Sequence, residues 1–176
     1  ILYLLLIDNS NFVTVSSTGE IKFFQILPSF QLNKTEQLNL TTNGLSFLDN
    51  RLFFFCPSKL IVVTNSQLLS SEFNIPLIEG ILQYQNYFFI YGGNQIIVLQ
   101  ITHEISILLS KQTHSNIKSM IFCQENNLFF SSHDSGDLIA WSIENNLSEV
   151  GRINISKGSV YVIRLYKNFL LTGDAL

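Results

Sequence analysis

The feature that most constrains this chain is a strand-rich pattern that recurs about every 40 residues. Four segments combine a polar or glycine-containing turn with a short run of β-branched and aromatic residues. Aligning them places Phe24, Val63, Leu99 and Trp141 at one position, at intervals of 39, 36 and 42 residues. Such periods, with several strands in each unit, are typical of β-propeller blades. The segments are TGEIKFFQI, SKLIVVT, NQIIVLQI and GDLIAWSI.

Each of these runs is one of four candidate strands in its unit. In the fourth unit, IKSMIFC and NLFFSS precede the aligned run, and the more polar LSEVGRINI follows it. Asn, Asp, Gly and Ser separate the runs, as at Asp49-Asn50, and these residues favour turns. We therefore expect four blades and part of a fifth, over residues 1–41, 42–75, 76–112, 113–156 and 157–176.

Other folds fit the same sequence less well. Strands that alternate with crossover helices need amphipathic stretches of ten or more residues, and the chain contains none. Runs such as LFFF and FFIY are apolar at consecutive positions, whereas a sheet with one wet face alternates. Middle strands of a blade are buried on both faces, so the propeller explains these runs. A two-sheet sandwich is the alternative, and the regular repeat argues against it.

The unit over residues 114–143 resembles a WD repeat. That family's pattern contains a Gly-His pair, an apolar strand, a Ser-x-Asp element and a strand that ends in Trp-Asp. Here Thr113-His114 stands in place of Gly-His, Ser132-His133-Asp134 provides the Ser-x-Asp, and Trp141-Ser142 replaces Trp-Asp. The stretch between Asp134 and Trp141 is about one residue longer than usual for the family.

The resemblance implies a hydrogen-bonded chain of His114, Ser132, Asp134 and Trp141 inside this blade. A buried Trp N–H needs an acceptor, a Ser hydroxyl provides one, and His connects the hydroxyl to a carboxylate. The other blades carry apolar residues in place of the Trp and rely on packing. The resemblance also implies a parent ring of seven blades, so we expect the chain, whose only Met is Met120, to be part of a longer protein.

Composition argues against several classes of function. The formal net charge of −3 with ten Lys and Arg residues gives no basic footprint for nucleic acid. No apolar run reaches the roughly 20 residues that span a bilayer. Cys56 and Cys123 lie within apolar runs and are expected to be buried free thiols, which favours a reducing cytoplasmic or nuclear location.

No recognisable active site is present in the sequence. Ser132, His133 and Asp134 are adjacent, and neighbouring strand residues point to opposite faces, so they cannot converge as a triad. His103, His114 and His133 lack the spacing of a zinc motif. Neither a metal nor a cofactor is predicted.

The sequence therefore favours a non-catalytic scaffold that binds other proteins, as a subunit of a larger assembly. By resemblance, partners dock on the loops that enter the inner strands and follow the second strands, which here contain Asn43, Ile78, Asn116 and His133. One alternative is a propeller hydrolase or lyase whose active site lies in blades outside this chain. A phosphoinositide-binding propeller is another, although its paired arginines are absent from the sequence.

Overall fold

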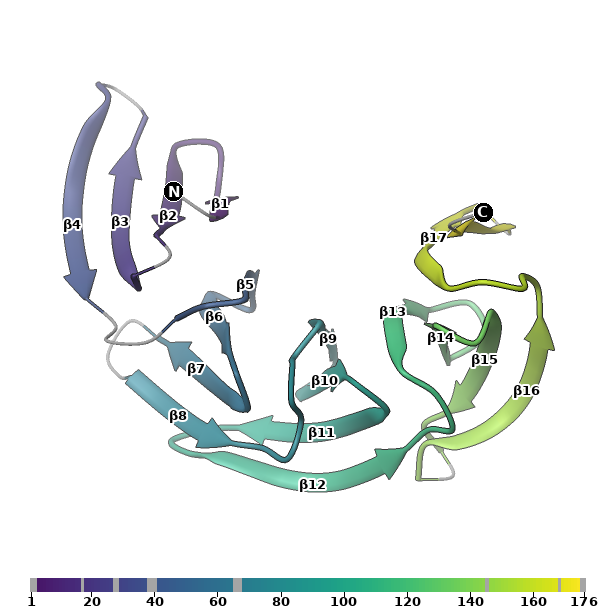
Figure 1. Cartoon of the computed structure of the whole chain (residues 1–176). Helices are drawn as coiled ribbons and strands as arrows, with labels where there is room; N and C mark the ends of the chain where they lie inside the picture. Colours follow the sequence, from purple (N-terminus) through teal and green to yellow (C-terminus); the bar gives the residue numbers. More distant parts are fainter. Residues whose placement is uncertain are drawn as a thin grey trace. The chain divides into compact units, whose positions relative to one another are not determined.

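The computed structural model describes residues 3–16, 18–26, 29–37, 41–64, 68–144, 146–167 and 169–174. These residues form eighteen β-strands and no helix, so the prediction of an all-β chain is confirmed. The strands make four four-stranded sheets and one two-stranded sheet (Figure 1). Every pairing among the described residues is antiparallel and joins consecutive strands. Each sheet is therefore a meander, and each lies within one of the predicted repeat units.

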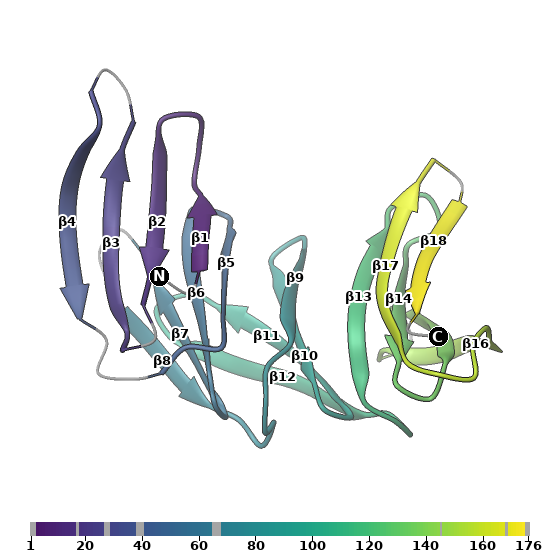
Figure 2. The same ribbon diagram turned by 45° about the horizontal axis from the view of Figure 1, so that its top comes forward.

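The first of two compact units spans Ile1–Ile78 and contains two sheets. In both sheets the strands follow one another in chain order, which Figure 2 shows side by side for β1 to β4. The strands are β1 (Tyr3–Leu6), β2 (Asn11–Val15), β3 (Glu20–Gln25), β4 (Gln31–Gln37), β5 (Gly44–Leu48), β6 (Arg51–Cys56), β7 (Lys59–Val63) and β8 (Leu68–Glu72).

The second unit spans Glu79–Leu176 and contains two complete sheets and a two-stranded one. The strands are β9 (Gly80–Tyr84), β10 (Tyr87–Gly92), β11 (Gln95–Ile101), β12 (Ile105–Gln112), β13 (Ile117–Cys123), β14 (Leu128–His133), β15 (Asp137–Ser142), β16 (Ser148–Asn154), β17 (Val160–Tyr166) and β18 (Phe169–Asp174).

The aligned residues of the repeat lie on the third strand of each complete sheet. Each pairs with an apolar residue of the second strand, which makes the pair the common element of the repeat. The pairs are Phe24 with Phe12, Val63 with Leu52, Leu99 with Phe88, and Trp141 with Phe129.

A β-bulge accompanies this position in three of the four sheets. The register between the third and fourth strands shifts between Phe23 and Phe24, between Val98 and Leu99, and between Ala140 and Trp141. The extra residue always lies on the fourth strand of its sheet, which we call the outer strand. The three extra residues are Asn33, Leu108 and Val150. A bulge increases the local twist of a strand, so each of these outer strands bends at the same point of the repeat.

Turn chemistry fixes the hairpins. Asp49 and Asn50 between β5 and β6 both have positive φ, at 50° and 56°, as a two-residue type I′ turn requires. Asn146 and Leu147 between β15 and β16 also have positive φ, at 53° and 55°. A left-handed Leu is unfavourable, and burial of the Leu147 side chain in the core of the second unit offsets that cost.

The core of each unit lies between successive sheets. In the first unit, Val13, Val15 and Ile21 pack against Leu52 and Phe54 of the next sheet, together with Cys56 and Ile61. In the second unit, Phe89, Ile96 and Val98 pack against Phe129, Ile139 and Trp141, and a smaller cluster joins Leu138 to Val160 and Ile163. Cys56 and Cys123 are buried and free, as predicted.

Candidate functional site

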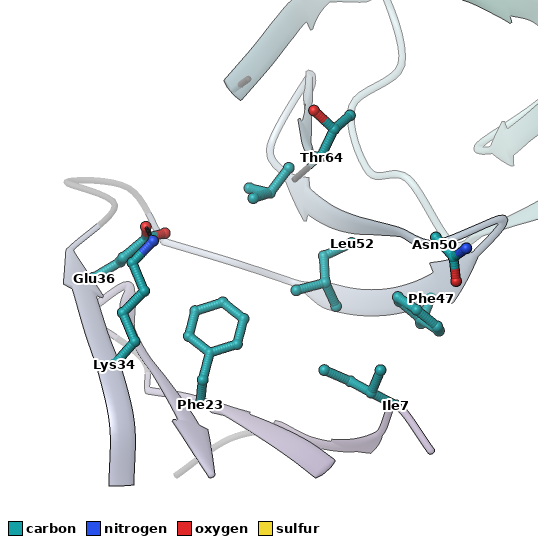
Figure 3. A pocket seen from close by; sticks show the side chains of 9 residues that line it. Ile7, Phe23, Lys34, Glu36, Phe47, Asn50, Leu52 and Thr64 are labelled. Carbon is teal, nitrogen blue, oxygen red and sulfur yellow. Dashed lines mark ion pairs between the residues drawn. The ribbon is translucent and has the colours of Figure 1, made fainter. Parts of the chain in front are cut away.

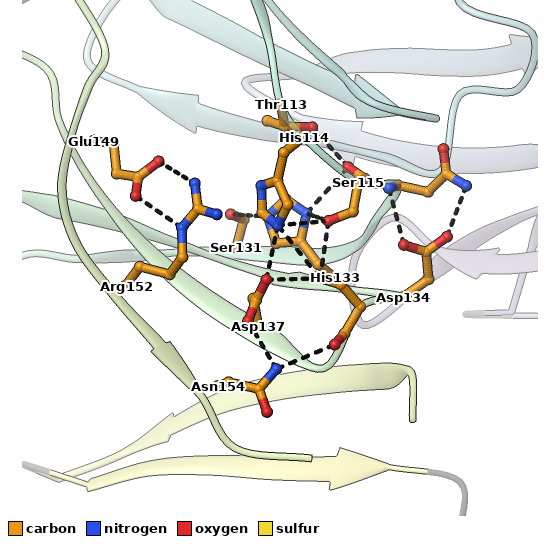
Figure 4. Close-up of polar contacts among 12 residues, drawn as sticks. Thr113, His114, Ser115, Ser131, His133, Asp134, Asp137, Glu149, Arg152 and Asn154 are labelled. Atoms are coloured by element: carbon orange, nitrogen blue, oxygen red, sulfur yellow. Dashed lines mark hydrogen bonds and ion pairs between the residues drawn. The ribbon is translucent and has the colours of Figure 1, made fainter. Parts of the chain in front are cut away.

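A chain of side-chain hydrogen bonds runs from the core of the second unit to the surface of one end of the sheet β13–β16 (Figure 4). It begins at Trp141, which is 2% exposed and donates from Nε1 to the Ser131 hydroxyl at 2.7 Å. Ser131 Oγ lies 2.8 Å from His133 Nε2. On the other side of the ring, His133 Nδ1 lies 3.2 Å from the carbonyl oxygen of Ser115. This carbonyl can only accept, so Nδ1 carries the proton and Nε2 accepts from Ser131.

The chain ends at a carboxylate near the surface. His114 Nε2 and the Ser135 hydroxyl donate to Asp137 Oδ2 at 2.7 Å and 2.8 Å, and Asn154 Nδ2 donates to Oδ1 at 2.8 Å. Ser115 Oγ lies 3.0 Å from Ser135 Oγ, which connects the two halves. The Asn154 amide, with the His114 and Ser135 donors, lowers the pKa of the Asp137 carboxyl to about 2. Asp137 is therefore ionised throughout the physiological range.

A second set of contacts ties together the loops at this end of the sheet. Asn116 donates from its backbone N and from Nδ2 to the two carboxylate oxygens of Asp134, at 3.0 Å and 2.7 Å. The Ser159 hydroxyl donates to the Asp134 carbonyl at 3.3 Å. These contacts thus connect the loop before β13, the turn after β14 and the loop after β16. We refer to the surface formed by His114, Asn116 and Ser135, all exposed, as the β13–β15 face.

The predicted network of His114, Ser132, Asp134 and Trp141 is wrong in two of its members. Trp141 bonds to Ser131 because Ser131 pairs with Ile139, two residues from Trp141 and on the same face of the sheet. Ser132 points to the opposite face of the sheet, where its hydroxyl lies 3.5 Å from the Ser119 carbonyl oxygen. The carboxylate bound to His114 is Asp137, while Asp134 binds Asn116. His114 and Trp141 are members, and His133 is a member that the sequence did not suggest.

Two of the four predicted docking positions are also wrong. His133 is 0% exposed because it shares a face with Ser131, and the aliphatic side chain of Ile78 is 2% exposed. Neither can reach a partner. Asn43 and Asn116 are exposed. Asn43 accepts from the Tyr3 hydroxyl through its carbonyl, and Asn116 donates to Asp134, so both exposed positions are held by hydrogen bonds to residues distant in the sequence.

His133 gives the network a dependence on pH. Burial lowers its pKa, and His114 adds to the effect, whereas the Ser115 carbonyl and the carboxylates of Asp137 and Asp134 oppose it. A lowered pKa in the folded state means that the unfolded chain binds the proton more tightly. The stability contributed by neutral His133 is then complete above its ordinary value of 6.5 and declines as the pH falls below it.

We expect the urea midpoint of the chain to fall between about pH 7.5 and about pH 5.5. The decline should be shallower in the His133→Gln variant, whose side chain does not titrate. His103→Gln, at an exposed position, is the matched control and should keep the wild-type slope. Equal slopes for all three proteins would contradict the assignment of His133 as a buried neutral group.

The described residues contain no helix that is long and apolar enough to cross a membrane. Across the same residues, no group of three or more His, Cys, Asp and Glu side chains could hold a metal ion.

Comparison with known proteins finds a solved structure of similar fold and no matching family. No family model matches the chain, and no curated protein matches it. A crystal structure of the computationally designed Ika8 protein is similar, with a TM-score of 0.79 and 17% sequence identity. The similarity covers 97% of this chain and 54% of the designed one, so the chain spans about half the length of that structure.

Proposed function

We propose that this chain forms blades of a WD-repeat β-propeller and acts as a non-catalytic scaffold for other proteins within a larger intracellular assembly. The observation that carries the proposal is the β13–β15 face, where side-chain hydrogen bonds connect three loops. Loops held in one conformation by a rigid sheet lose little entropy when a partner binds. Such a surface suits recognition of another protein.

The propeller is supported by the repeated four-stranded meanders and by packing between successive sheets within each unit. The chain from Trp141 through Ser131 and the histidines to Asp137 uses the residue types of the WD network. It uses them in a shifted arrangement, with a buried second histidine.

The geometry does not suit nucleophilic catalysis. In a Ser-His-Asp triad the hydroxyl and the carboxylate bind opposite nitrogens of the imidazole. Here Ser115 Oγ and Asp137 Oδ2 both contact His114 Nε2, at 3.2 Å and 2.7 Å. The hydroxyl and the carboxylate compete for one nitrogen, so the carboxylate cannot orient His114 as a base for Ser115.

The test is recovery of partners with a variant of the β13–β15 face. Asn116→Arg places a long cation on the face and removes the amide contact with Asp134. In affinity purification from the source cells, we expect a defined set of proteins with the wild-type chain and at least a tenfold lower yield with this variant.

Val150→Arg is the matched control, since Val150 is an exposed residue of the outer strand β16. It should leave recovery unchanged. Equal recovery with both variants would remove the β13–β15 face from the proposal, and recovery of no protein by the wild-type chain would contradict the scaffold function.

A further inference from the structure

The first unit contains a cavity of about 440 Å³ between its two sheets (Figure 3). Five of the lining residues are apolar and come from both sheets: Ile7, Phe23, Phe47, Leu52 and Val63. The polar lining residues are Lys34, Glu36, Asn50 and Thr64. A cavity of this size and composition is in the range of binding sites for small apolar groups.

The internal repeat explains why this space is open. The residue pairings between strands allow the sheets β1–β4 and β5–β8 of the first unit to be aligned with the sheets β9–β12 and β13–β16 of the second. In this alignment Val63 corresponds to Trp141, and Leu52 corresponds to Phe129, its cross-strand partner. Ile7, next to β1, corresponds to Tyr84 at the end of β9.

In the second unit these three positions hold aromatic rings that fill the space. Trp141 is 2% exposed and Phe129 is 0% exposed. The Tyr84 and Phe129 ring centroids are 6.1 Å apart, and the Tyr84 hydroxyl donates to Asn127 at 2.8 Å. In the first unit, three aliphatic side chains stand in place of the three rings. The cavity therefore lies beside the repeat position that Trp141 occupies in the second unit.

We propose that this cavity binds an aromatic side chain of a partner peptide, with Trp or Phe as the anchor residue. The shape is set by the repeat, because the same backbone arrangement accommodates an indole in the second unit. The first unit offers no hydroxyl at the position of Ser131, where Phe54 stands. The floor is thus apolar, and the interaction is burial of a ring and not a hydrogen bond to an indole N–H.

The rim of the cavity suits the backbone of an extended peptide. Lys34 and Glu36 of β4 form an ion pair on one side, and Asn50 lies in the β5–β6 turn on the opposite side (Figure 3). A polar rim around an apolar pocket is the usual arrangement at an anchor residue. This inference goes beyond the proposed function, since it concerns the first unit and depends on neither the WD resemblance nor the β13–β15 face.

The test uses the 176-residue chain and the peptide acetyl-Ser-Gly-Trp-Gly-Ser-amide with 5-fluorotryptophan, followed by ¹⁹F NMR. Versions with Phe, Leu and Ala in place of Trp are measured by competition. We expect the Trp and Phe peptides to bind at least tenfold more tightly than the Ala peptide, because a buried ring contributes that much. Binding of the Ala peptide with equal affinity would overturn the proposal.

Two variants connect binding to the cavity. Val63→Trp fills it with the residue of the second unit and should abolish binding of the fluorinated peptide without lowering the Tm. Leu52→Phe introduces the residue found at the corresponding position of the second unit, Phe129, whose ring is smaller than that of Trp. This variant should weaken binding at least threefold, and it serves as the test if Val63→Trp fails to fold. Leu4→Trp, at an exposed position of β1 that alternates with the inward-facing Leu5 and Ile7, is the control and should bind as the wild type does.

Unchanged binding in both cavity variants would overturn the proposal, as would a wild-type chain that binds none of the peptides. A higher Tm for Val63→Trp together with no binding by the wild type would show that the cavity is a packing defect. None of these outcomes bears on the Asn116→Arg experiment, so the two proposals fail separately.

Discussion

Replacement of Trp141 by alanine is expected to lower the free energy of unfolding by about 3–5 kcal/mol. The side chain is buried in the core of the second unit with Phe129 and Ile139, and its loss leaves a large cavity. It also removes the N–H that binds Ser131, so the buried hydroxyl loses a partner. Chemical denaturation of the chain, with its stability read from the urea midpoint and slope, measures the effect.

Trp141→Phe removes the hydrogen bond to Ser131 and keeps an aromatic ring, so it measures the hydrogen bond apart from the loss of volume. It keeps most of the apolar volume and should cost about 1–2 kcal/mol. Phe24→Ala is the matched control, since Phe24 occupies the same repeat position in the first sheet but is only partly buried. It should cost less than half as much as Trp141→Ala. A loss for Trp141→Ala no larger than that for Phe24→Ala would show that the network does not contribute to the core.

Gly136→Ala is expected to destabilise the chain by about 2–4 kcal/mol. Gly136 has φ of +83°, which side chains other than glycine rarely adopt, and a Cβ would lie 1.9 Å from the carbonyl oxygen of Ser156. The backbone N of Ile155 also donates to the Gly136 carbonyl at 3.0 Å. The turn cannot move away from the clash without breaking that contact and displacing Asp137.

Gly151→Ala is the control for this substitution, because a Cβ there would meet only the Ala140 Cβ, at 4.0 Å. Its effect should lie within about 0.5 kcal/mol of zero. We also expect Gly136→Ala, and not Gly151→Ala, to disturb the His114 and His133 ring signals in NMR spectra. Equal stability of the two variants would mean that the turn is less constrained than its φ and contacts indicate.

Much of the fold could be predicted because it depends on features that a sequence displays directly. The spacing of Phe24, Val63, Leu99 and Trp141 located the third strand of each complete sheet. Turn residues such as Asp49-Asn50 marked the hairpins, since few residues adopt positive φ there. These features are local, so no knowledge of distant contacts was needed.

The sequence predicted that the sheet β13–β16 contains a hydrogen-bond network of Trp, Ser, His and Asp side chains, but not which Ser and Asp residues belong to it. Its members depend on which residues share a face of β14, and a shift of one residue reverses that assignment. The longer stretch between Asp134 and Trp141 was the sign in the sequence that the usual register of the family does not apply. Phe129 pairs with Trp141, and every second residue after Phe129 shares its face of β14. These residues are Ser131 and His133. The bulge between Ile117 and Ser119 also changes how β13 meets β14, and a bulge leaves no clear mark in a single sequence.

The cavity of the first unit could not be predicted at all. It results from three aliphatic residues, Ile7 after β1, Leu52 on β6 and Val63 on β7, and each of them is an ordinary apolar residue by itself. Only the alignment of the two sheet pairs through their registers reveals that Ile7, Leu52 and Val63 replace rings.

The bulges of the outer strands bear on how copies of this chain avoid edge-to-edge aggregation. An unpaired outer strand offers a row of free backbone donors and acceptors to any other strand, and long regular edges invite aggregation. The three long outer strands, of 7, 8 and 7 residues, are each interrupted by a bulge. The uninterrupted one, β8, has only 5 residues. Each outer strand thus has its own protection, and deletion of Leu108 or Val150 would restore a continuous row of backbone donors and acceptors along the edge, to which the strand of another copy would pair.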